Sequence, residues 1–158
     1  MTKKATEPAW MEPAAFGRSL PDGLGLNLLV RDVEASCAFA RHVFQAEIVH
    51  EDPDFAYVRL PALGVAPGAL GAAWMLHGDH TYSDHRMGGL VRSVQGRGAG
   101  AELQLYGLDP DACEARAREW GYQVFEGSID KPHGRRECYL FDPDWYVWVP
   151  SIGIPAGR

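Results

Sequence analysis

Cysteine is scarce in this sequence, and long apolar runs are absent. The three cysteines are widely spaced and form no Cys-x-x-Cys pair. An odd, scattered set neither frames a disulfide scaffold nor provides a zinc motif, so we expect a reduced, cytoplasmic protein. No apolar run approaches the ~20 residues that span a bilayer, and the N-terminus has two lysines but no apolar signal-peptide core. The sequence therefore predicts no contact with a membrane.

Positive charge is also in deficit. Lysine and arginine together number 15 against 21 aspartates and glutamates, which gives a net charge of −6. A protein that binds nucleic acid normally carries a basic stripe along the phosphates, so we expect no nucleic-acid partner. Common catalytic signatures are missing too, since the chain has no P-loop, no GxGxxG turn and no nucleophile elbow. A cationic or neutral small molecule suits this composition better.

The chain is long enough for one well-filled core but too short for two ordinary domains. We expect an N-terminal arm, one domain and a short tail, at residues 1–23, 24–150 and 151–158. Prolines and glycines interrupt the arm too often for a long helix or a central strand, so it is predicted to be extended. Trp10, Met11 and Phe16 make it apolar enough to pack on a surface. A disordered tail is the alternative.

The domain contains an internal repeat. Asp32 aligns with Asp109, 77 residues later, and Arg41 aligns with Arg118. Each aspartate stands where it can cap a helix, and each helix follows a strand of alternating apolar residues. We predict the order β-α-β-β-β in each copy, with helices at about 33–44 and 110–120. The two units are expected at about 24–77 and 101–150, linked by an unstructured loop at 78–100 that is suited to act as a lid.

The end of the domain predicts an antiparallel hairpin. Two β-rich apolar runs, 137–141 and 146–149, flank the short segment Asp142-Pro143-Asp144-Trp145. Pro150 is expected to end the second strand, because proline has no N–H to donate to a ladder.

The two β-α-β-β-β units, their Asp-capped helices and the closing GRREC…DPDxYxW hairpin resemble the vicinal oxygen chelate superfamily, which holds glyoxalases, extradiol dioxygenases and bleomycin-resistance proteins. The resemblance covers roughly residues 24–150. It implies an α+β fold in which two tandem βαβββ units form a half-open curved barrel around a ligand. Where the family usually has glycine after Asp-Pro-Asp, this chain has Trp145, so the turn must either avoid a positive φ or hold a bulky residue under strain.

The resemblance also implies where a metal would lie. Metal-using relatives place one ligand near the start of each unit's first strand and one in each unit's last strand. The matching positions here are Gly25, Trp74 or Met75, Glu102 and Val149. Only Glu102 can bind a divalent ion, and a catalytic ion normally needs about three protein ligands. We therefore predict no metal and no cofactor, with a divalent metal as the alternative.

Polar and aromatic side chains indicate the ligand-binding face. Strand alternation places Asn27 on the inner face of the first unit, opposite the helix. The run from His77 to His85 packs three histidines and two acids into nine residues, but its spacing fits no strong zinc motif. It is a polar loop, a loop that closes the pocket or, as a third alternative, a metal site. The predicted ligand-binding residues are Asn27, Trp74, His80, Tyr82, His85, Glu102, Gln104, Tyr106 and Trp148.

Two functions from different classes remain. The first is a metal-free protein that sequesters an aromatic or cationic compound, as the bleomycin-resistance branch does in antibiotic resistance. The second is a lyase, isomerase or dioxygenase that uses a divalent metal, or Glu102 or a histidine such as His77 as general base. The tryptophans are plain core residues in the alternative interpretation. We also expect a homodimer, because sheet edges need cover and the arm is available to cross to a partner.

Overall fold

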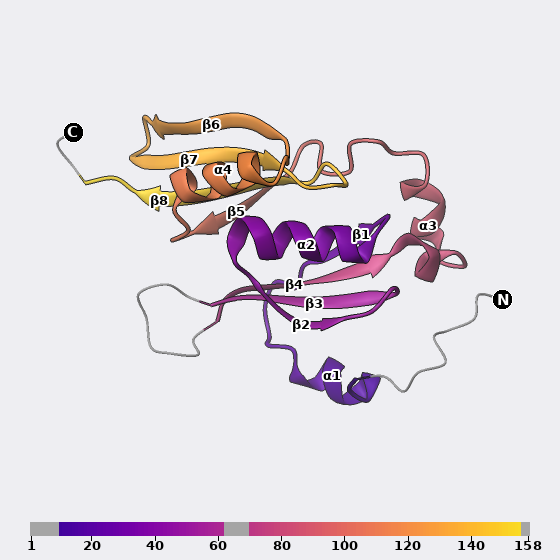
Figure 1. Cartoon of the computed structure of the whole chain (residues 1–158). Helices are drawn as coiled ribbons and strands as arrows, with labels where there is room; N and C mark the ends of the chain where they lie inside the picture. Colours follow the sequence, from indigo (N-terminus) through magenta and orange to yellow (C-terminus); the bar gives the residue numbers. More distant parts are fainter. Residues whose placement is uncertain (1–9, 62–69, 156–158) are drawn as a thin grey trace.

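The computed structural model describes residues 10–61 and 70–155, and two sheets form its layers with helices between them (Figure 1). The first unit contains β1 (Asn27–Val30), α2 (Val33–Phe44), β2 (Glu47–Glu51), β3 (Phe55–Pro61) and β4 (Leu70–Gly78). The second unit contains β5 (Glu102–Tyr106), α4 (Pro110–Glu119), β6 (Val124–Lys131), β7 (Arg135–Phe141) and β8 (Val147–Gly153). Outside the two units lie α1 (Pro13–Ser19), the 3₁₀ turn η1 (Asp79–Tyr82) and α3 (Arg86–Val91).

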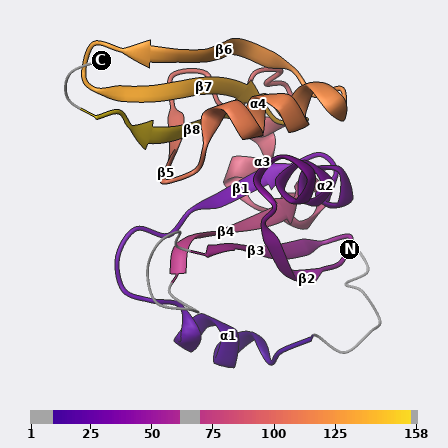
Figure 2. The ribbon, with the colours of Figure 1, turned by 60° about the vertical axis from the view of Figure 1, so that its left-hand side comes forward.

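The two sheets have the same topology. Sheet 1 has the order β1-β4-β3-β2 and sheet 2 the order β5-β8-β7-β6. In each sheet the first strand runs parallel to the last, and the other neighbours are antiparallel. This confirms two βαβββ units in an α+β fold, and the sheets do not close into a barrel. Because α2 and α4 lie between the sheets, the outer faces of the two sheets point in opposite directions (Figure 2).

Local signals explain where both helices begin. The Asp32 carboxylate accepts a hydrogen bond from the Ala35 amide at 3.0 Å, and Asp109 caps α4 in the same way through the Asp111 amide at 3.0 Å. One core fills the space between the sheets and includes residues of both units. No helix among the described residues is long and apolar enough to cross a membrane.

Trp74 of β4 and Trp148 of β8 meet in this core, with ring centroids 4.9 Å apart. They are 3% and 2% exposed. Neither ring reaches an outer face, so both side chains are core residues. Both strands are covered on two sides, so alternation alone did not reveal which side each tryptophan takes.

The closing hairpin differs from prediction at its end. Strand β8 continues through Pro150 to Gly153 instead of stopping at the proline. Its ladder to β7 has partners at Trp148 and again at Ser151, with none at the two positions between. The ladder therefore opens where Pro150 lacks a donor and then resumes.

The turn of this hairpin adopts the strained alternative, since Trp145 has φ 67°. The Asp142 side chain holds the turn, because its Oδ1 accepts from the amides of Asp144 and Tyr146 at 2.9 and 3.0 Å. Its Oδ2 accepts from Trp148 Nε1 at 3.0 Å, so the turn is also tied to the core.

Two further segments are more ordered than the sequence suggested. The arm was predicted to be extended, but residues 13–19 form α1. The linker at 78–100 was predicted to be unstructured, but it contains η1 and α3. These helical segments are short and carry little apolar periodicity, so the hydrophobic pattern of the sequence did not reveal them.

Candidate functional site

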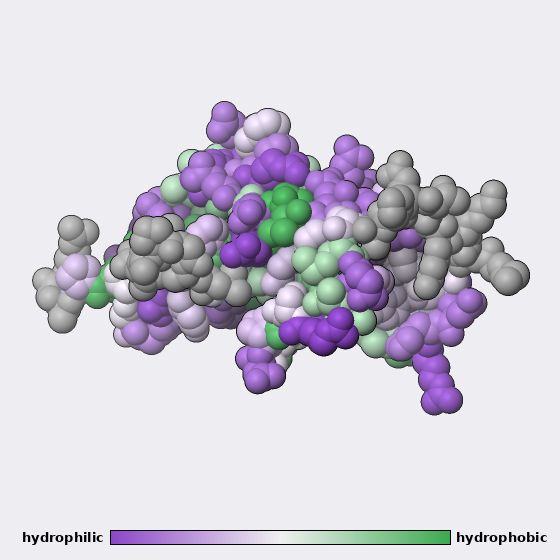
Figure 3. Space-filling view, turned by 90° about the horizontal axis from the view of Figure 1, so that it is seen from below, coloured by the Kyte–Doolittle hydropathy of each residue, from purple (hydrophilic) through white to green (hydrophobic). Residues whose placement is uncertain are grey.

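A pocket of about 260 Å³ lies between α1 and the outer face of sheet 1. Figure 3 views the molecule from this side and shows apolar residues at the centre of the face, with polar residues around them. The lining comes partly from the N-terminal segment and partly from sheet 1. It consists of Trp10, Met11, Pro13, Phe16, His50, Asp52, Phe55, Met75 and His77.

Helix α1 forms because its first turn is capped. Glu12 stands at the N-cap, where its carboxylate accepts from the amides of Ala14 and Ala15 at 3.1 and 2.9 Å. Pro13 at the first helical position needs no hydrogen-bond partner for its nitrogen. None of the helix residues is fully buried, so the helix depends on packing against the sheet.

Aromatic contacts hold α1 on sheet 1. The Trp10 ring stacks on His50, with centroids 4.9 Å apart and an interplanar angle of 11°. Phe16 meets Phe55 and Tyr57 edge-on, at 5.5 and 5.2 Å. The predicted apolar character of the arm is therefore used to cover the chain's own sheet.

His77 of β4 is the central polar group of the pocket. Its Nδ1 lies 2.6 Å from Asn27 Oδ1, and Asn27 Nδ2 donates to the Tyr82 hydroxyl at 3.0 Å. An amide oxygen can only accept, so His77 Nδ1 carries the hydrogen and Nε2 keeps its lone pair. Burial lowers the pKa of His77, although the charge of Asp52 opposes the shift. The imidazole is therefore a neutral, oriented acceptor near pH 7.

Asp52 supplies negative charge to the same pocket. Its Oδ2 lies 2.7 Å from His50 Nε2, and its Oδ1 accepts from the amides of Asp54 and Phe55, both at 2.8 Å. Burial alone would raise the pKa of Asp52, but these hydrogen bonds outweigh it and the pKa lies below its ordinary value. The pocket thus combines aromatic walls with an anion and a neutral acceptor.

The structure brings together part of the predicted site. Asn27, His77 and Tyr82 form one hydrogen-bonded chain, although they come from three different elements. His85 lies behind Tyr82 with ring centroids 5.0 Å apart, and it caps α3 through the Met87 amide. His77 and His85 therefore have separate partners.

His80 turns to Asp54 instead, with Nε2 and Oδ1 2.7 Å apart. Across residues 10–61 and 70–155, no three His, Cys, Asp or Glu side chains converge where a metal ion could be held.

The predicted residues of the second unit lie elsewhere, on the outer face of sheet 2. Glu102 is exposed and accepts from Gln104 Nε2 at 2.9 Å. Tyr106 is 68% exposed, and the Arg135 guanidinium lies 4.6 Å from the centre of its ring. The two sheets lie on opposite sides of α2 and α4 (Figure 2), so the outer face of sheet 2 points away from α1. These side chains are not among the residues that line the α1 pocket.

The strand registers test whether the chain fits the divalent metal that the sequence resemblance implies. Asn27 pairs with Met75 as Gln104 pairs with Val149, so Met75 occupies the fourth position and Trp74 faces the core. The four positions are therefore held by an exposed Gly25, the thioether of Met75, the carboxylate of Glu102 and the aliphatic side chain of Val149. These donors do not fit a catalytic divalent ion.

Sequence reasoning missed His50, Asp52 and Phe55. Their signal was present, since His50 ends a short apolar run just before an Asp-Pro-Asp turn, and Phe55 begins the next one. A larger hollow of about 450 Å³ also borders this turn and is lined by Arg31, Asp32, Val33, Glu34, Glu51, Asp52 and Pro53. It contains no aromatic residue, so it offers less to a flat ligand than the α1 pocket does.

Comparison with known proteins gives the fold its name. No protein-family model matches this chain, and no curated protein sequence matches it. Solved structures do match. A glyoxalase/bleomycin resistance protein/dioxygenase from Nocardioides is 18% identical, with 92% of this chain and 94% of that chain covered at a TM-score of 0.59.

Two other structures extend this result. A glyoxalase/bleomycin resistance protein/dioxygenase family enzyme from Burkholderia phytofirmans PsJN is 16% identical, with 82% of this chain and 96% of that chain covered at a TM-score of 0.63. The fosfomycin resistance protein FosX from Listeria monocytogenes is 18% identical, with 85% and 95% covered at 0.58. The chain therefore has the fold of the glyoxalase/bleomycin resistance/dioxygenase proteins, the vicinal oxygen chelate fold.

Proposed function

We propose that this protein binds and sequesters a flat aromatic compound that carries a positive charge or a hydrogen-bond donor. The single observation behind this proposal is the α1 pocket, in which aromatic walls surround two acceptors, Asp52 and His77. Among residues 10–61 and 70–155 no lysine or arginine lines the pocket, and Asp52 gives it a negative charge. A cationic ring satisfies both through stacking and a charged hydrogen bond.

The size of the pocket narrows the ligand class. Drug-sized ligands usually occupy about 300–1,000 Å³, and this pocket measures about 260 Å³. A compound of one or two rings fits that volume. Trp10 already stacks on His50, which supports a wall suited to flat rings. Two of the matched structures are named as bleomycin or fosfomycin resistance proteins, which supports antibiotic resistance as a setting for such binding.

Benzamidine and benzamide provide a matched test, because the first is an aromatic cation and the second is its neutral isostere. Calorimetry of the full chain is expected to give one-to-one binding, with benzamidine the tighter ligand. Asp52→Asn retains an oxygen for the turn amides but loses the charge, so it should weaken benzamidine about tenfold and leave benzamide nearly unchanged. Equal losses for both ligands, or binding that survives Phe55→Ala, would contradict the proposed pocket.

A catalytic role is the second candidate, and the neutral, oriented His77 is the observation that favours it. Because Nδ1 carries the hydrogen, Nε2 can accept a proton from a compound bound in the pocket that His77 lines. If the protein is an enzyme, His77→Gln should abolish turnover of a bound compound while it still binds. Sequestration predicts that the compound is recovered chemically unchanged from wild-type protein, which NMR of the mixture would detect.

We further propose a cytoplasmic homodimer. Phe125 and Trp145 are 67% and 47% exposed beside Phe141, on the outer face of sheet 2 that a second copy would cover. Glu102 lies on this same outer face. We propose that it contacts a cationic ligand there when the second copy covers the face. Light scattering at tens of micromolar should report a dimer, and Phe125→Ser should weaken it. A monomeric wild type would end this proposal.

A further inference from the structure

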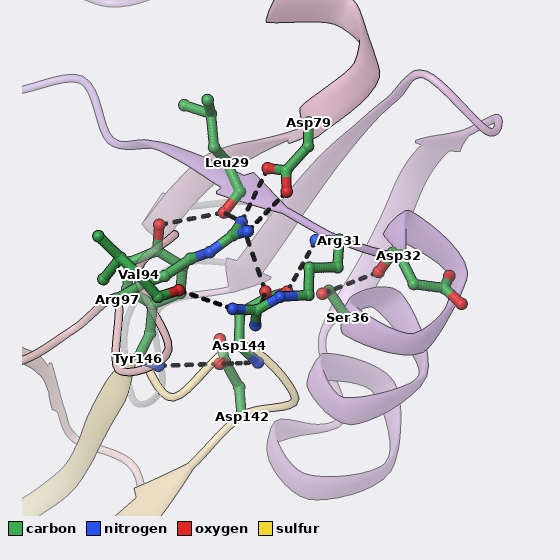
Figure 4. A network of polar contacts seen from close by, with 10 residues as sticks. All are labelled: Leu29, Arg31, Asp32, Ser36, Asp79, Val94, Arg97, Asp142, Asp144 and Tyr146. Atoms are coloured by element: carbon green, nitrogen blue, oxygen red, sulfur yellow. Dashed lines mark hydrogen bonds and ion pairs between the residues drawn. The ribbon is translucent and has the colours of Figure 1, made fainter. Parts of the chain in front are cut away.

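Arg97 lies in the linker between α3 and β5, where the two units meet (Figure 4). Its side chain is only 2% exposed. The guanidinium forms a fork on the Asp79 carboxylate, with Nη1 and Nη2 at 2.8 and 2.5 Å from its two oxygens. Nη1 also donates to the Leu29 carbonyl at 2.8 Å. One buried cation thus joins the start of η1 to strand β1.

Both of these acceptors are close in sequence to the pocket. Asp79 begins η1, and Tyr82 ends it. Leu29 is the register partner of His77 and lies two residues from Asn27 on the same strand. Arg97 therefore anchors two of the three members of the chain Tyr82–Asn27–His77: Tyr82 through η1, and the central Asn27 through β1.

The second unit supports the same edge. Strand β1 is the outermost strand of sheet 1, so one side of it has no neighbouring strand. On that side Tyr146 donates from its hydroxyl to the Leu29 carbonyl at 3.1 Å. Asp144 accepts from the Arg31 amide at 3.0 Å and lies 3.4 Å from Arg97 Nη1. On this edge of β1 the backbone groups of Leu29 and Arg31 are therefore bound by side chains of Arg97, Asp144 and Tyr146.

Energetics favour a geometric role for this cation. Arg97 Nε is buried and has no hydrogen-bond partner within the described part of the chain. A buried ion pair often gives no more stability than apolar packing of similar volume would. What a planar fork does provide is a fixed direction, which lysine cannot reproduce.

We propose that Arg97 is a positioning residue that holds the Asn27 amide so that His77 keeps its hydrogen on Nδ1 and its lone pair on Nε2. The inference rests on the proposed function to the extent that His77 is an anchor of the pocket. Asp52 is the charged group that faces His77, and it makes no hydrogen bond to Arg97. Arg97 therefore acts on His77 through backbone placement.

Arg97→Lys keeps the charge and removes the fork. Nitrogen NMR of the free, full-length protein is expected to show a single Nδ1–H tautomer of His77 in the wild type and a mixture in Arg97→Lys. Arg31→Lys is the matched control, because Arg31 binds Asp144 and Val94 but neither Asp79 nor Leu29. Its His77 should remain as in the wild type.

A folded Arg97→Lys protein with the wild-type tautomer would overturn the inference. If that variant fails to fold, Asp79→Asn decides by the same measurement, since it removes one arm of the fork and keeps an acceptor for Nη1. Benzamidine affinity should fall by the reciprocal of the Nδ1–H fraction that remains, about twofold for an equal mixture of tautomers. A tautomer change without any ligand binding refutes the proposed function alone, and binding with an unchanged tautomer refutes the positioning role alone.

Discussion

Replacing Phe16 with alanine should release α1 from sheet 1 and leave the rest of the fold intact. The helix has seven residues, too few to be stable alone in water. Phe16 makes two edge-on ring contacts to sheet 1, each worth about 0.5–1.5 kcal/mol, and burial of roughly half a phenylalanine adds about 1 kcal/mol. Phe16→Ala therefore weakens the attachment of α1 to sheet 1 by about 2–4 kcal/mol, and the Trp10 ring then provides most of the contact that remains.

Amide hydrogen exchange measures this directly. A loss of about 2–4 kcal/mol lowers the protection of the amides of residues 14–20 by roughly 30-fold to several hundredfold, or to none once α1 is open. The urea midpoint of the remaining protein should barely move. Phe125→Ala is the control, because that ring is exposed on sheet 2 and should leave α1 protected.

Two results would refute the reasoning. Undiminished protection in Phe16→Ala would mean that the two aromatic contacts do not hold α1. A fall in global stability equal to the whole loss would mean that α1 unfolds together with the sheets. The expected result also removes one wall of the pocket, so benzamidine should bind less tightly to Phe16→Ala.

Three further outcomes are expected. The folded-state pKa of His77 lies below its unfolded value, so the unfolded chain binds the proton more readily and stability is lost as pH falls below about 6.5. In urea titrations from pH 7.5 to 5, the free energy of unfolding should therefore fall more in the wild type than in His77→Gln. A constant difference between the two proteins would contradict this. Gly98→Ala should lower the free energy of unfolding by about 1–3 kcal/mol, because the added Cβ would lie 2.7 Å from the Trp145 carbonyl oxygen. Gly96→Ala is the control and should lower it little, because nothing lies within 4 Å of the added Cβ. Equal effects would argue against the close approach at Gly98. Elemental analysis of purified protein should find no stoichiometric divalent metal, because Glu102 is the single suitable donor among the four family positions; one equivalent of bound metal, with activity lost on chelation, would promote the enzyme alternative.

The helices were the most predictable part of the fold. The expected helices at about 33–44 and 110–120 are α2 and α4, which the structure places at Val33–Phe44 and Pro110–Glu119. Capping aspartates and apolar periodicity act within a few residues, so the sequence displays them directly. Helix α1 escaped prediction, because its stability depends on rings of β3 that lie far along the chain.

The candidate site was only partly predictable for the same reason. Alternation placed Asn27 on the face opposite α2, and the histidine-rich run drew attention to His77 and Tyr82. That these three side chains form one hydrogen-bonded chain depends on strand pairing between β1 and β4. His50 and Asp52 join the pocket only because α1 folds back over them.

By itself the sequence determined the duplicated βαβββ order, the bounds of both main helices and the lack of a second strong metal donor at the family positions. The tertiary structure alone decided which outer face α1 covers, which side of each sheet the tryptophans take and which partners the polar groups choose. His77 meets Asn27 across 50 residues, and Arg97 meets Leu29 across 68. Local propensity acts over a few residues, whereas contacts over such separations form only once both units have packed around one core.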